Sequence, residues 1–249
     1  MTYGVCNLSI IPLRAEASDS SELVSQILYG EIFKVLEKRS KWSRIRLAFD
    51  SYEGWVDNKQ FAALLEEQYN DLQKEKLHMS SDLVEFITTS ENQLLSICLG
   101  STLNPLHILK HSFEGKSISE TLQKQHLVKT ALLYLNTPYL WGGKTPFGID
   151  CSGFTQMVYK LNGYNLKRDA SEQVTQGQAL SFIEESEPGD LAFFDNAEGK
   201  IVHVGIIMKD NSIIHAHGKV RIDGLDHTGI FNYESKTYSH QLRVIKKIV

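Results

Sequence analysis

The segment that spans residues 137–161 constrains the fold of this chain more than any other part of the sequence. It opens with a loop, because the run TPYLWGG contains one proline and two glycines. After the loop, apolar residues recur at helical spacing from Phe154 to Leu161, which predicts a helix that begins at or next to Cys151. The chain therefore presents a cysteine at the first turn of a helix, soon after a glycine-rich loop.

A cysteine at the start of a helix is well placed for chemistry. Unpaired backbone N–H groups and the positive end of the helix dipole stabilise a thiolate, and such sites can lower the pKa of a cysteine from about 8.5 to between roughly 3.5 and 7.5. The same N–H groups can hold an oxyanion that forms during a reaction. We therefore expect Cys151 to have a lowered pKa and to act as a nucleophile.

A thiol nucleophile needs a base, and two predicted strands supply histidines. Residues 201–207 (IVHVGII) and 212–217 (SIIHAH) are rich in β-branched residues and are typical of strands. If these strands are neighbours in one sheet, His203 can lie over Cys151 as general base and acid, while His215 orients its imidazole. His215 and His217 point to the same face of their strand, so spacing alone does not choose between them.

Composition excludes several classes of protein. Hydrophobic residues make up 42% and charged residues 22% of the 249 residues, which is typical of a globular chain with a sizeable core and one or two domains. No apolar stretch approaches the roughly 18–20 residues of a transmembrane helix, so we expect no membrane partner. The 26 Lys and Arg residues stand against 30 Asp and Glu without a dense basic run, so we expect no nucleic-acid partner.

The cysteines and the N-terminal residues indicate in which cellular compartment the protein works. The chain has three cysteines and no Cys-x-x-Cys pair, which fits neither a disulfide framework nor a four-thiolate zinc site. The first positive charge is Arg14, and Pro12 directly follows a short apolar pair, so the start does not read as a secretory signal. We expect a cytoplasmic monomer without a metal or other cofactor.

Residues 1–62 predict a small β-barrel. Short runs rich in Ile, Val, Leu and aromatic residues are typical of strands, and turn signals separate them; these runs are 26–28, 32–37, 42–47 and 54–56. The rhythm of Leu13-Arg14, Leu23-Val24, Gly30-Glu31, Trp42 and Gly54-Trp55-Val56 resembles the bacterial SH3-like (SH3b) module. Any other small five-stranded β domain is the alternative.

Residues 63–120 predict a linker helix and then a less regular region. Apolar residues recur at helical intervals among charged ones at 61–76. Beyond them, 94–99 and 108–113 are typical of strands, which suggests a second, degenerate SH3-like region. The pattern changes near residue 121, where recurring leucines predict a helix that Pro138 ends and a new domain begins.

Five short segments within residues 121–249 share an order and spacing with one enzyme family. They are Tyr139-Leu140-Trp141-Gly142-Gly143, Asp150-Cys151-Ser152-Gly153-Phe154, Pro188-Gly189-Asp190-Leu191, His203-Val204-Gly205-Ile206 and Ile214-His215. In these segments the region resembles the NlpC/P60 family of cysteine peptidases. The resemblance implies an α+β, papain-like fold, in which a helix bearing the cysteine packs on an antiparallel sheet. It also implies that Cys151 is the nucleophile, His203 the base and His215 the third catalytic residue.

With an SH3-like module in front, the chain is further similar to the γ-D-glutamyl-L-diamino acid endopeptidases, which cut murein peptides that have a free N-terminal L-Ala. This resemblance implies that the L-Ala amine and the D-Glu α-carboxylate are bound by residues of the SH3-like domain and by residues near the cysteine. The matching positions are Tyr52, Glu16, Tyr139, Asp150, Ser152 and the segment Arg168-Asp169-Ala170-Ser171, in which Asp169 and Ser171 are the expected binding residues. Many relatives have a hydroxyl directly after the Arg-Asp pair, whereas this chain has Ala170 before Ser171.

On this resemblance we expect a cysteine endopeptidase that releases L-Ala-γ-D-Glu from murein peptides during cell-wall peptide recycling. One alternative is a thiol-dependent amidase or acyltransferase with the same catalytic residues, and another is a non-catalytic wall-binding protein. A third is a hydrolase whose zinc is bound by His203, His215 and His217, since catalytic zinc commonly has three protein ligands. No His-Glu-x-x-His motif is present and Cys151 would then have no role, which argues against zinc.

Overall fold

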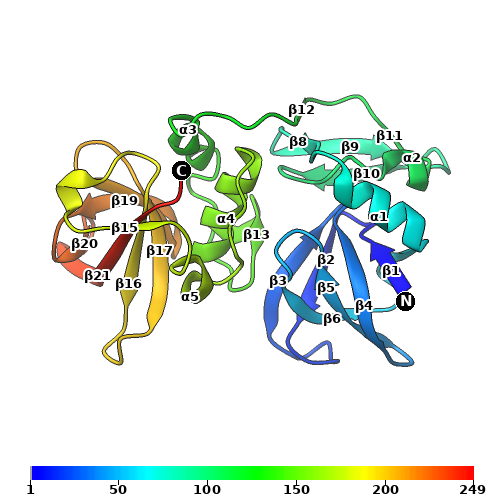
Figure 1. Ribbon diagram of the computed structural model, residues 1–249, viewed down its shortest axis with the longest axis horizontal. Coiled ribbons are helices and arrows are strands. Elements are labelled where there is room, and N and C mark those ends of the chain that lie inside the picture. The colour runs from blue at the N-terminus through cyan, green and yellow to red at the C-terminus, as the bar shows by residue number, and fades with distance from the viewer. Residues whose placement is uncertain (1) are drawn as a thin grey trace. The chain divides into compact units, whose positions relative to one another are not determined.

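The computed structural model describes residues 2–249, and the chain divides into two units (Figure 1). The first unit extends to Glu120 and also contains Trp141–Pro146, whereas the second consists of Thr121–Leu140 and Phe147–Val249. The sequence predicted one domain for residues 121–249. The structure instead assigns six residues of the loop before Cys151 to the first unit.

Side-chain contacts explain why this part of the loop belongs to the first unit. The indole Nε1 of Trp141 donates a hydrogen bond to Glu22 at 2.6 Å, and the backbone N–H of Lys144 donates to Gln26 at 2.7 Å. The ammonium group of Lys144 lies 3.5 Å from a carboxylate oxygen of Glu31, and both side chains are buried. A buried charge is costly unless it is paired, so this ion pair holds the segment in the first unit.

Seven strands of the first unit form an antiparallel sheet in the order β3-β2-β6-β5-β4-β1-β7, and the predicted SH3-like barrel is confirmed. The strands are β1 (Thr2–Val5), β2 (Ile10–Arg14), β3 (Leu23–Leu28), β4 (Ile32–Lys38), β5 (Trp42–Leu47), β6 (Glu53–Asp57) and β7 (Ala62–Leu64). Burial alternates along β5, where Ile45 and Leu47 are buried and Arg44 and Arg46 are exposed. This period of two gives the barrel one apolar cluster, to which Phe33 also belongs.

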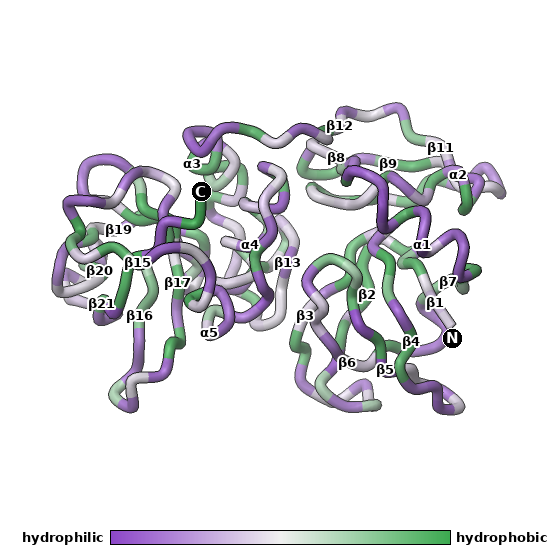
Figure 2. Tube along the Cα trace, in the orientation of Figure 1, coloured by the Kyte–Doolittle hydropathy of each residue, from purple (hydrophilic) through white to green (hydrophobic). Residues whose placement is uncertain are grey.

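The predicted linker helix is present as α1 (Glu66–Lys74). It is mostly polar, as its purple colour in Figure 2 shows, and only Tyr69 and Leu72 are buried. These two residues pack against Tyr3 and Val5 of the first strand, and the rings of Tyr3 and Tyr69 stack with centroids 4.3 Å apart. A helix this short depends on such packing, because isolated helices of its length are marginal in water.

The rest of the first unit contains two small sheets. Its elements are β8 (Met79–Ser80), β9 (Val84–Thr88), β10 (Leu94–Cys98), α2 (Leu106–Leu109), β11 (Ser112–Phe113) and β12 (Ser117–Ile118), paired in the orders β10-β9-β11 and β12-β8. The strand predicted for 108–113 is wrong in its first half, because Ile108 and Leu109 belong to a helical turn. Pro105 directly precedes that turn, and Lys110 ends it in the left-handed conformation with φ of 56°.

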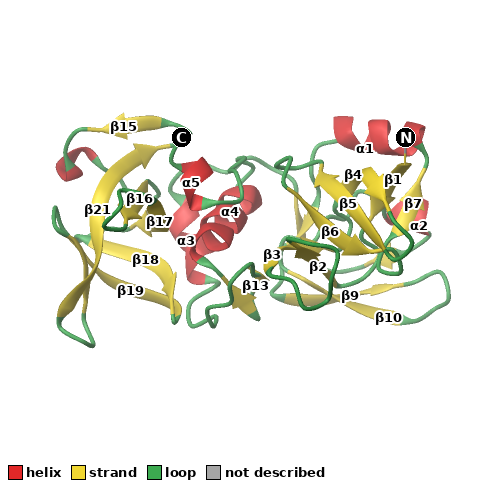
Figure 3. Ribbon diagram, turned by 90° about the horizontal axis from the view of Figure 1, so that it is seen from below, coloured by secondary structure: helices red, strands yellow, loops and turns green. Residues whose placement is uncertain are grey.

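The second unit combines three helices with a seven-stranded sheet. The helices are α3 (His126–Leu132), α4 (Cys151–Leu161) and α5 (Ala170–Gln173). The predicted helix at Cys151 and the papain-like arrangement are confirmed, since α4 packs against the antiparallel strands β17 (Ile201–Ile207) and β18 (Ser212–His217). Figure 3 shows the three helices grouped beside the sheet. None of the helices within residues 2–249 is long and apolar enough to cross a membrane.

Six strands of this sheet close into a barrel. The order is β15-β21-β16-β17-β18-β19-β20, and β20 also pairs with β21. The other strands are β15 (Gln178–Leu180), β16 (Leu191–Asp195), β19 (Lys219–Leu225), β20 (Gly229–Asn232) and β21 (Thr237–Lys247), and the short elements β13 (Lys144–Thr145), β14 (Gly148–Ile149) and η1 (Ile183–Glu185) complete the chain. Apolar residues that include Phe194, Ile207, Ile213 and Ile230 fill one part of the barrel interior.

Polar residues occupy the same interior face further along the strands. Side chains alternate between faces, so His203 shares a face with Ile207, and His215 shares one with Ile213. The register also pairs His240 with Ile230. Barrel closure therefore directs side chains from β17, β18 and β21 toward one another, although these strands are far apart in sequence.

Candidate active site

Cys151 is the first residue of the active-site helix, and Asp150 caps that helix. Asp150 has an extended backbone, and its Oδ1 accepts a hydrogen bond from the N–H of Gly153 at 2.6 Å. An aspartate at this position satisfies one of the free N–H groups of the first turn. The cap fixes where the helix begins, and with it the position of the Cys151 thiol.

Arg168 binds the capping aspartate through its guanidinium group. Its Nη1 and Nη2 donate to Oδ1 and Oδ2 of Asp150 at 3.0 and 2.5 Å, and Nη1 also donates to the hydroxyl of Ser152 at 3.0 Å. The Arg168 side chain is only 1% exposed. Two predicted binding residues, Asp150 and Ser152, are thus held by Arg168, which belongs to the predicted binding segment 168–171.

The resting state of the thiol differs from the sequence-based expectation. Burial, followed by the negative charge of Asp150, raises the pKa of Cys151 to about 12. The backbone N–H groups of Val204 and Ser152, together with Arg168, act in the opposite direction but are outweighed. The expectation of a lowered pKa is therefore wrong for the free protein. The N–H groups at the helix start favour the thiolate, but burial of the thiol penalises it more.

The two predicted histidines are directly hydrogen-bonded. His203 Nε2 lies 2.8 Å from His215 Nδ1, and both side chains are buried. Burial, and then the neighbouring histidines, lower the pKa of His203 well below its usual range; burial also lowers that of His215. Both rings are therefore neutral near pH 7. The Cys151 thiol lies next to this histidine pair. The backbone N–H of Val204, the residue that follows His203, donates a hydrogen bond to the sulfur.

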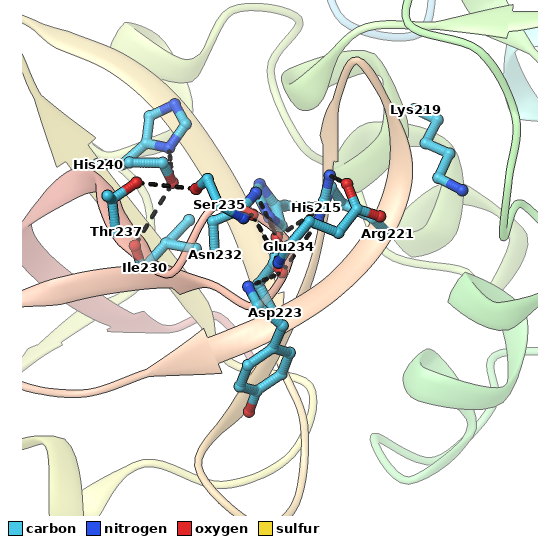
Figure 4. A network of polar contacts seen from close by, with 12 residues as sticks. His215, Lys219, Arg221, Asp223, Ile230, Asn232, Glu234, Ser235, Thr237 and His240 are labelled. Atoms are coloured by element: carbon cyan, nitrogen blue, oxygen red, sulfur yellow. Dashed lines mark hydrogen bonds and ion pairs between the residues drawn. The ribbon is translucent and has the colours of Figure 1, made fainter.

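Asp223 extends the chain of hydrogen bonds beyond the residues that the sequence identified. Its Oδ2 lies 3.2 Å from His215 Nε2, and its side chain is fully buried. Burial raises the pKa of Asp223, but hydrogen bonds from His215 and Arg221 outweigh it and lower the value to about 2. Figure 4 shows the carboxylate at the centre of this polar network.

Two further histidines surround the ring of His203. The ring of His240 stacks on that of His203 with centroids 4.1 Å apart and an angle of 20°, and the ring of His217 lies 6.4 Å away. Burial lowers the pKa of His240 to about 4. Within residues 2–249, no group of three or more His, Cys, Asp or Glu side chains is arranged to hold a metal ion. The zinc alternative based on His203, His215 and His217 therefore lacks the geometry it needs.

The other predicted binding residues of the second unit lie in three places. Tyr139 lies near the thiol, since Cys151 contributes to the electrostatic environment that, after burial, raises the pKa of the Tyr139 hydroxyl. Asp169 is the N-cap residue of α5, and its backbone carbonyl accepts from the N–H groups of Glu172 and Gln173. Ser171 is exposed on α5, while Ala170 before it is buried.

Tyr52 and Glu16, the remaining predicted binding residues, belong to the first unit. Tyr52 packs partly against the barrel core, and its N–H donates to Oδ1 of Asp50 at 2.9 Å. Glu16 is exposed in the turn between β2 and β3, where its N–H donates to the hydroxyl of Ser21. Their roles as binding residues stay predictions.

The fold and the polar chain of the second unit define a class of protein. A cysteine at the start of a buried helix, packed on an antiparallel sheet that carries a hydrogen-bonded histidine pair, is the arrangement of a papain-like cysteine peptidase. Residues 136–240 match the NlpC/P60 family, and residues 13–61 match the family described as bacterial dipeptidyl-peptidase SH3 domain. The chain is therefore a peptidase with an NlpC/P60 domain that follows a bacterial SH3 domain.

Named relatives and solved structures extend over most of the chain. Dipeptidyl-peptidase 6 of Lysinibacillus sphaericus is 29% identical, with 86% of this chain and 88% of the relative covered. Gamma-D-glutamyl-L-lysine dipeptidyl-peptidase of Bacillus subtilis is 27% identical, with 77% and 71% covered. The crystal structure of an NlpC/P60 family protein from Bacillus cereus shares the fold with a TM-score of 0.80, at 20% identity and with 99% of each chain covered.

Proposed function

We propose that the protein is a cysteine endopeptidase that hydrolyses the γ-D-glutamyl–diamino acid bond of murein peptides with a free N-terminal L-Ala, releasing L-Ala-γ-D-Glu. The observation that carries this proposal is the hydrogen-bonded pair His203–His215 beside the residue whose N–H contacts the Cys151 thiol. Two relatives that match most of the chain are named dipeptidyl-peptidase 6 and gamma-D-glutamyl-L-lysine dipeptidyl-peptidase, which supports the proposal.

In the first half of the reaction, the sulfur of Cys151 attacks the γ-carbonyl carbon of D-Glu while the thiol proton moves to His203. Because the thiol is neutral at rest, this proton transfer accompanies the attack. The developing oxyanion accepts hydrogen bonds from backbone N–H groups near the start of the helix. His203 then gives its proton to the leaving amine nitrogen, the C–N bond breaks, and a thioester remains on Cys151.

Water completes the cycle. His203 takes a proton from a water molecule, whose oxygen attacks the thioester carbon. The C–S bond breaks, the proton passes from His203 to the sulfur, and L-Ala-γ-D-Glu leaves with a new carboxylic acid that loses its proton to solvent. His215 keeps its hydrogen bond to His203 through both halves, so the base stays oriented without becoming a reactant itself.

We also propose that the enzyme acts as a monomer in the cytoplasm, in the recycling of cell-wall peptides. All three cysteines, Cys6, Cys98 and Cys151, are free and buried, which fits a reducing compartment. Fractionation of cells that express the protein at its natural level tests this placement: activity in the soluble cytoplasmic fraction supports it, and activity confined to the culture medium or wall fraction contradicts it.

The substrate proposal is tested with L-Ala-γ-D-Glu-meso-diaminopimelate, the same peptide acetylated on the L-Ala amine, and a Cys151→Ala control. Mass spectrometry of the products should show L-Ala-γ-D-Glu from the free peptide and a rate lower by orders of magnitude for the acetylated one. Equal rates for both peptides would refute the requirement for a free amine. If neither peptide is cleaved, the proposed substrate is wrong, and the protein is a cysteine hydrolase that acts on a different amide or acyl substrate.

A further inference from the structure

The carboxylate of Asp223 is surrounded entirely by groups that donate hydrogen bonds. The donors are Arg221 Nε at 2.7 Å and Nη2 at 3.3 Å, the N–H of Tyr233 at 3.1 Å, Asn232 Nδ2 at 3.5 Å and His215 Nε2 at 3.2 Å. Arginine and the backbone N–H have no acceptor to offer. Asp223 is therefore an ionised acceptor, and the ring nitrogen that faces it must carry a hydrogen.

This requirement determines where the hydrogen lies on each histidine. A neutral imidazole carries one hydrogen, so a hydrogen on His215 Nε2 leaves His215 Nδ1 as an acceptor. That Nδ1 lies 2.8 Å from His203 Nε2, which must then be the donor. His203 in turn is left with a lone pair on Nδ1. The hydrogen-bond partners of one buried carboxylate thus specify the tautomer of both rings.

We propose that Asp223 is a positioning residue that fixes the tautomer of His215 and, through it, that of His203, so that Nδ1 of His203 holds the lone pair that receives the thiol proton. The assignment of His203 as the base rests on the proposed function, whereas the tautomers do not. When the thiol proton arrives at Nδ1, His203 becomes an imidazolium and keeps its hydrogen on Nε2. The hydrogen bonds from His203 to His215 and from His215 to Asp223 therefore keep the same donor and acceptor throughout the catalytic cycle.

Arg221 binds the carboxylate of Asp223 through its guanidinium group. It makes two contacts with Asp223, and its Nη1 pairs with the exposed Glu234 at 3.1 Å (Figure 4). The titratable or charged groups that face the His215–Asp223 pair are His203 on β17, His217 on β18, Arg221 on β19 and His240 on β21. The Arg221 guanidinium is always charged, and it stabilises the carboxylate as an anion.

The wild-type protein tests the tautomers without any variant. Nitrogen-15 NMR of histidine-labelled protein at pH 7.5 separates protonated from unprotonated ring nitrogens. We expect His203 and His215 both to carry hydrogen on Nε2 and none on Nδ1. A hydrogen on Nδ1 of His215 would overturn the proposal. Since this measurement needs no substrate, its failure is distinguishable from failure of the proposed function.

The substitution Asp223→Asn keeps the shape of the side chain but can present a donor to His215. His215 would then carry its hydrogen on Nδ1, and His203 would carry its own on Nδ1, where the thiol proton must go. We expect kcat to fall by up to about 10⁴-fold, the loss known for a wrong tautomer in a comparable triad. KM should change little. Spectra of the variant that retain both hydrogens on Nε2 would overturn the proposal, as would unchanged kcat.

Two comparisons separate this role from a merely structural one. Asp226→Asn makes the same change in a carboxylate that bonds to Tyr238 and to the loop backbone, and it should leave kcat within about twofold and the tautomers unchanged. In a His215→Asn background, the amide oxygen can accept from His203 Nε2 directly. Adding Asp223→Asn there should cost far less than in the wild type. An equal cost in both backgrounds would show that Asp223 acts only on the fold.

Discussion

The imidazole of His240 stacks on that of His203, with ring centroids 4.1 Å apart and an angle of 20° between the planes. The two residues are 37 positions apart in sequence and lie on strands separated by β16, whose Phe194 contacts both rings. His240 thus covers one face of the proposed base. Such a cover limits rotation of the ring and keeps water away from it.

His240→Ala should lower kcat about 10- to 100-fold, because a ring that can rotate spends less time in the reactive geometry. His240→Phe keeps an aromatic face over His203 and should lose no more than a few-fold. Burial lowers the pKa of His203. The Ala variant exposes the His203 ring to water, and the pKa of His203 should therefore rise. The acid limb of the profile of kcat/KM against pH should move to higher pH in that variant. Equal losses in the Ala and Phe variants would contradict a stacking role.

The raised pKa of Cys151 predicts a specific alkylation profile. Iodoacetamide reacts with the thiolate, so in the free protein the reaction at Cys151 should be slow at pH 7 and should keep accelerating above pH 8. Peptide mapping by mass spectrometry follows Cys151 separately from Cys6 and Cys98. A rate that is already maximal at pH 6 would mean that a preformed thiolate–imidazolium pair exists, contrary to the neutral resting state.

The ion pair between Arg168 and Asp150 should be important for stability because both groups are buried. Arg168→Met removes the charged partner of the buried Asp150 carboxylate, which we expect to cost about 3–5 kcal/mol of unfolding free energy. The control is Arg46→Met, which removes the exposed ion pair with Glu53 and should cost at most about 1 kcal/mol. Denaturant titration measures both. A cost below 1 kcal/mol for Arg168→Met would show that the pair is not needed to hold the helix cap.

Acidification should destabilise the second unit through its buried histidines. The pKa values of His203 and His215 are lowered by burial, so below about pH 6.5 the unfolded chain binds protons that the folded protein does not. Their stabilising contribution is present above pH 6.5 and is lost as the pH falls, at up to about 1.4 kcal/mol per pH unit for each residue. Hydrogen exchange of peptides from 201–217 should accelerate between pH 7 and pH 5, after correction for the intrinsic rate. The exposed His227, changed to Gln, is the matched control and should leave this dependence intact. A protection that is independent of pH would contradict the neutral, buried state of the pair.

Local sequence patterns predicted the helix and the two strands that carry Cys151, His203 and His215. Helical spacing predicted that the active-site helix begins at or next to Cys151, and it begins at Cys151; β-branched runs predicted strands at 201–207 and 212–217, where the structure has β17 and β18. These signals are local, since a helix cap and a strand pattern depend on neighbours in sequence. The period of two also placed His215 and His217 on one face, and the hydrogen bond to His203 then distinguishes His215.

Asp223 and His240 were not predicted, because their roles depend on closure of the barrel. Asp223 reaches His215 through the register of β18 with β19, and His240 reaches the interior through the pairing of β20 with β21. No short motif marks either residue. The raised pKa of Cys151 was missed for a related reason, since burial is a property of the packed structure and the helix start is a property of the local sequence.

Trapping the thioester tests the central claim most directly. The protein is mixed with excess L-Ala-γ-D-Glu-meso-diaminopimelate, quenched in acid within one turnover, digested and analysed by mass spectrometry. We predict that the peptide containing Cys151 gains the mass of one L-Ala-γ-D-Glu acyl group, and that no adduct forms on Cys6 or Cys98. Product release in the same time course without any acyl adduct on Cys151, or undiminished turnover by Cys151→Ala, would contradict the account.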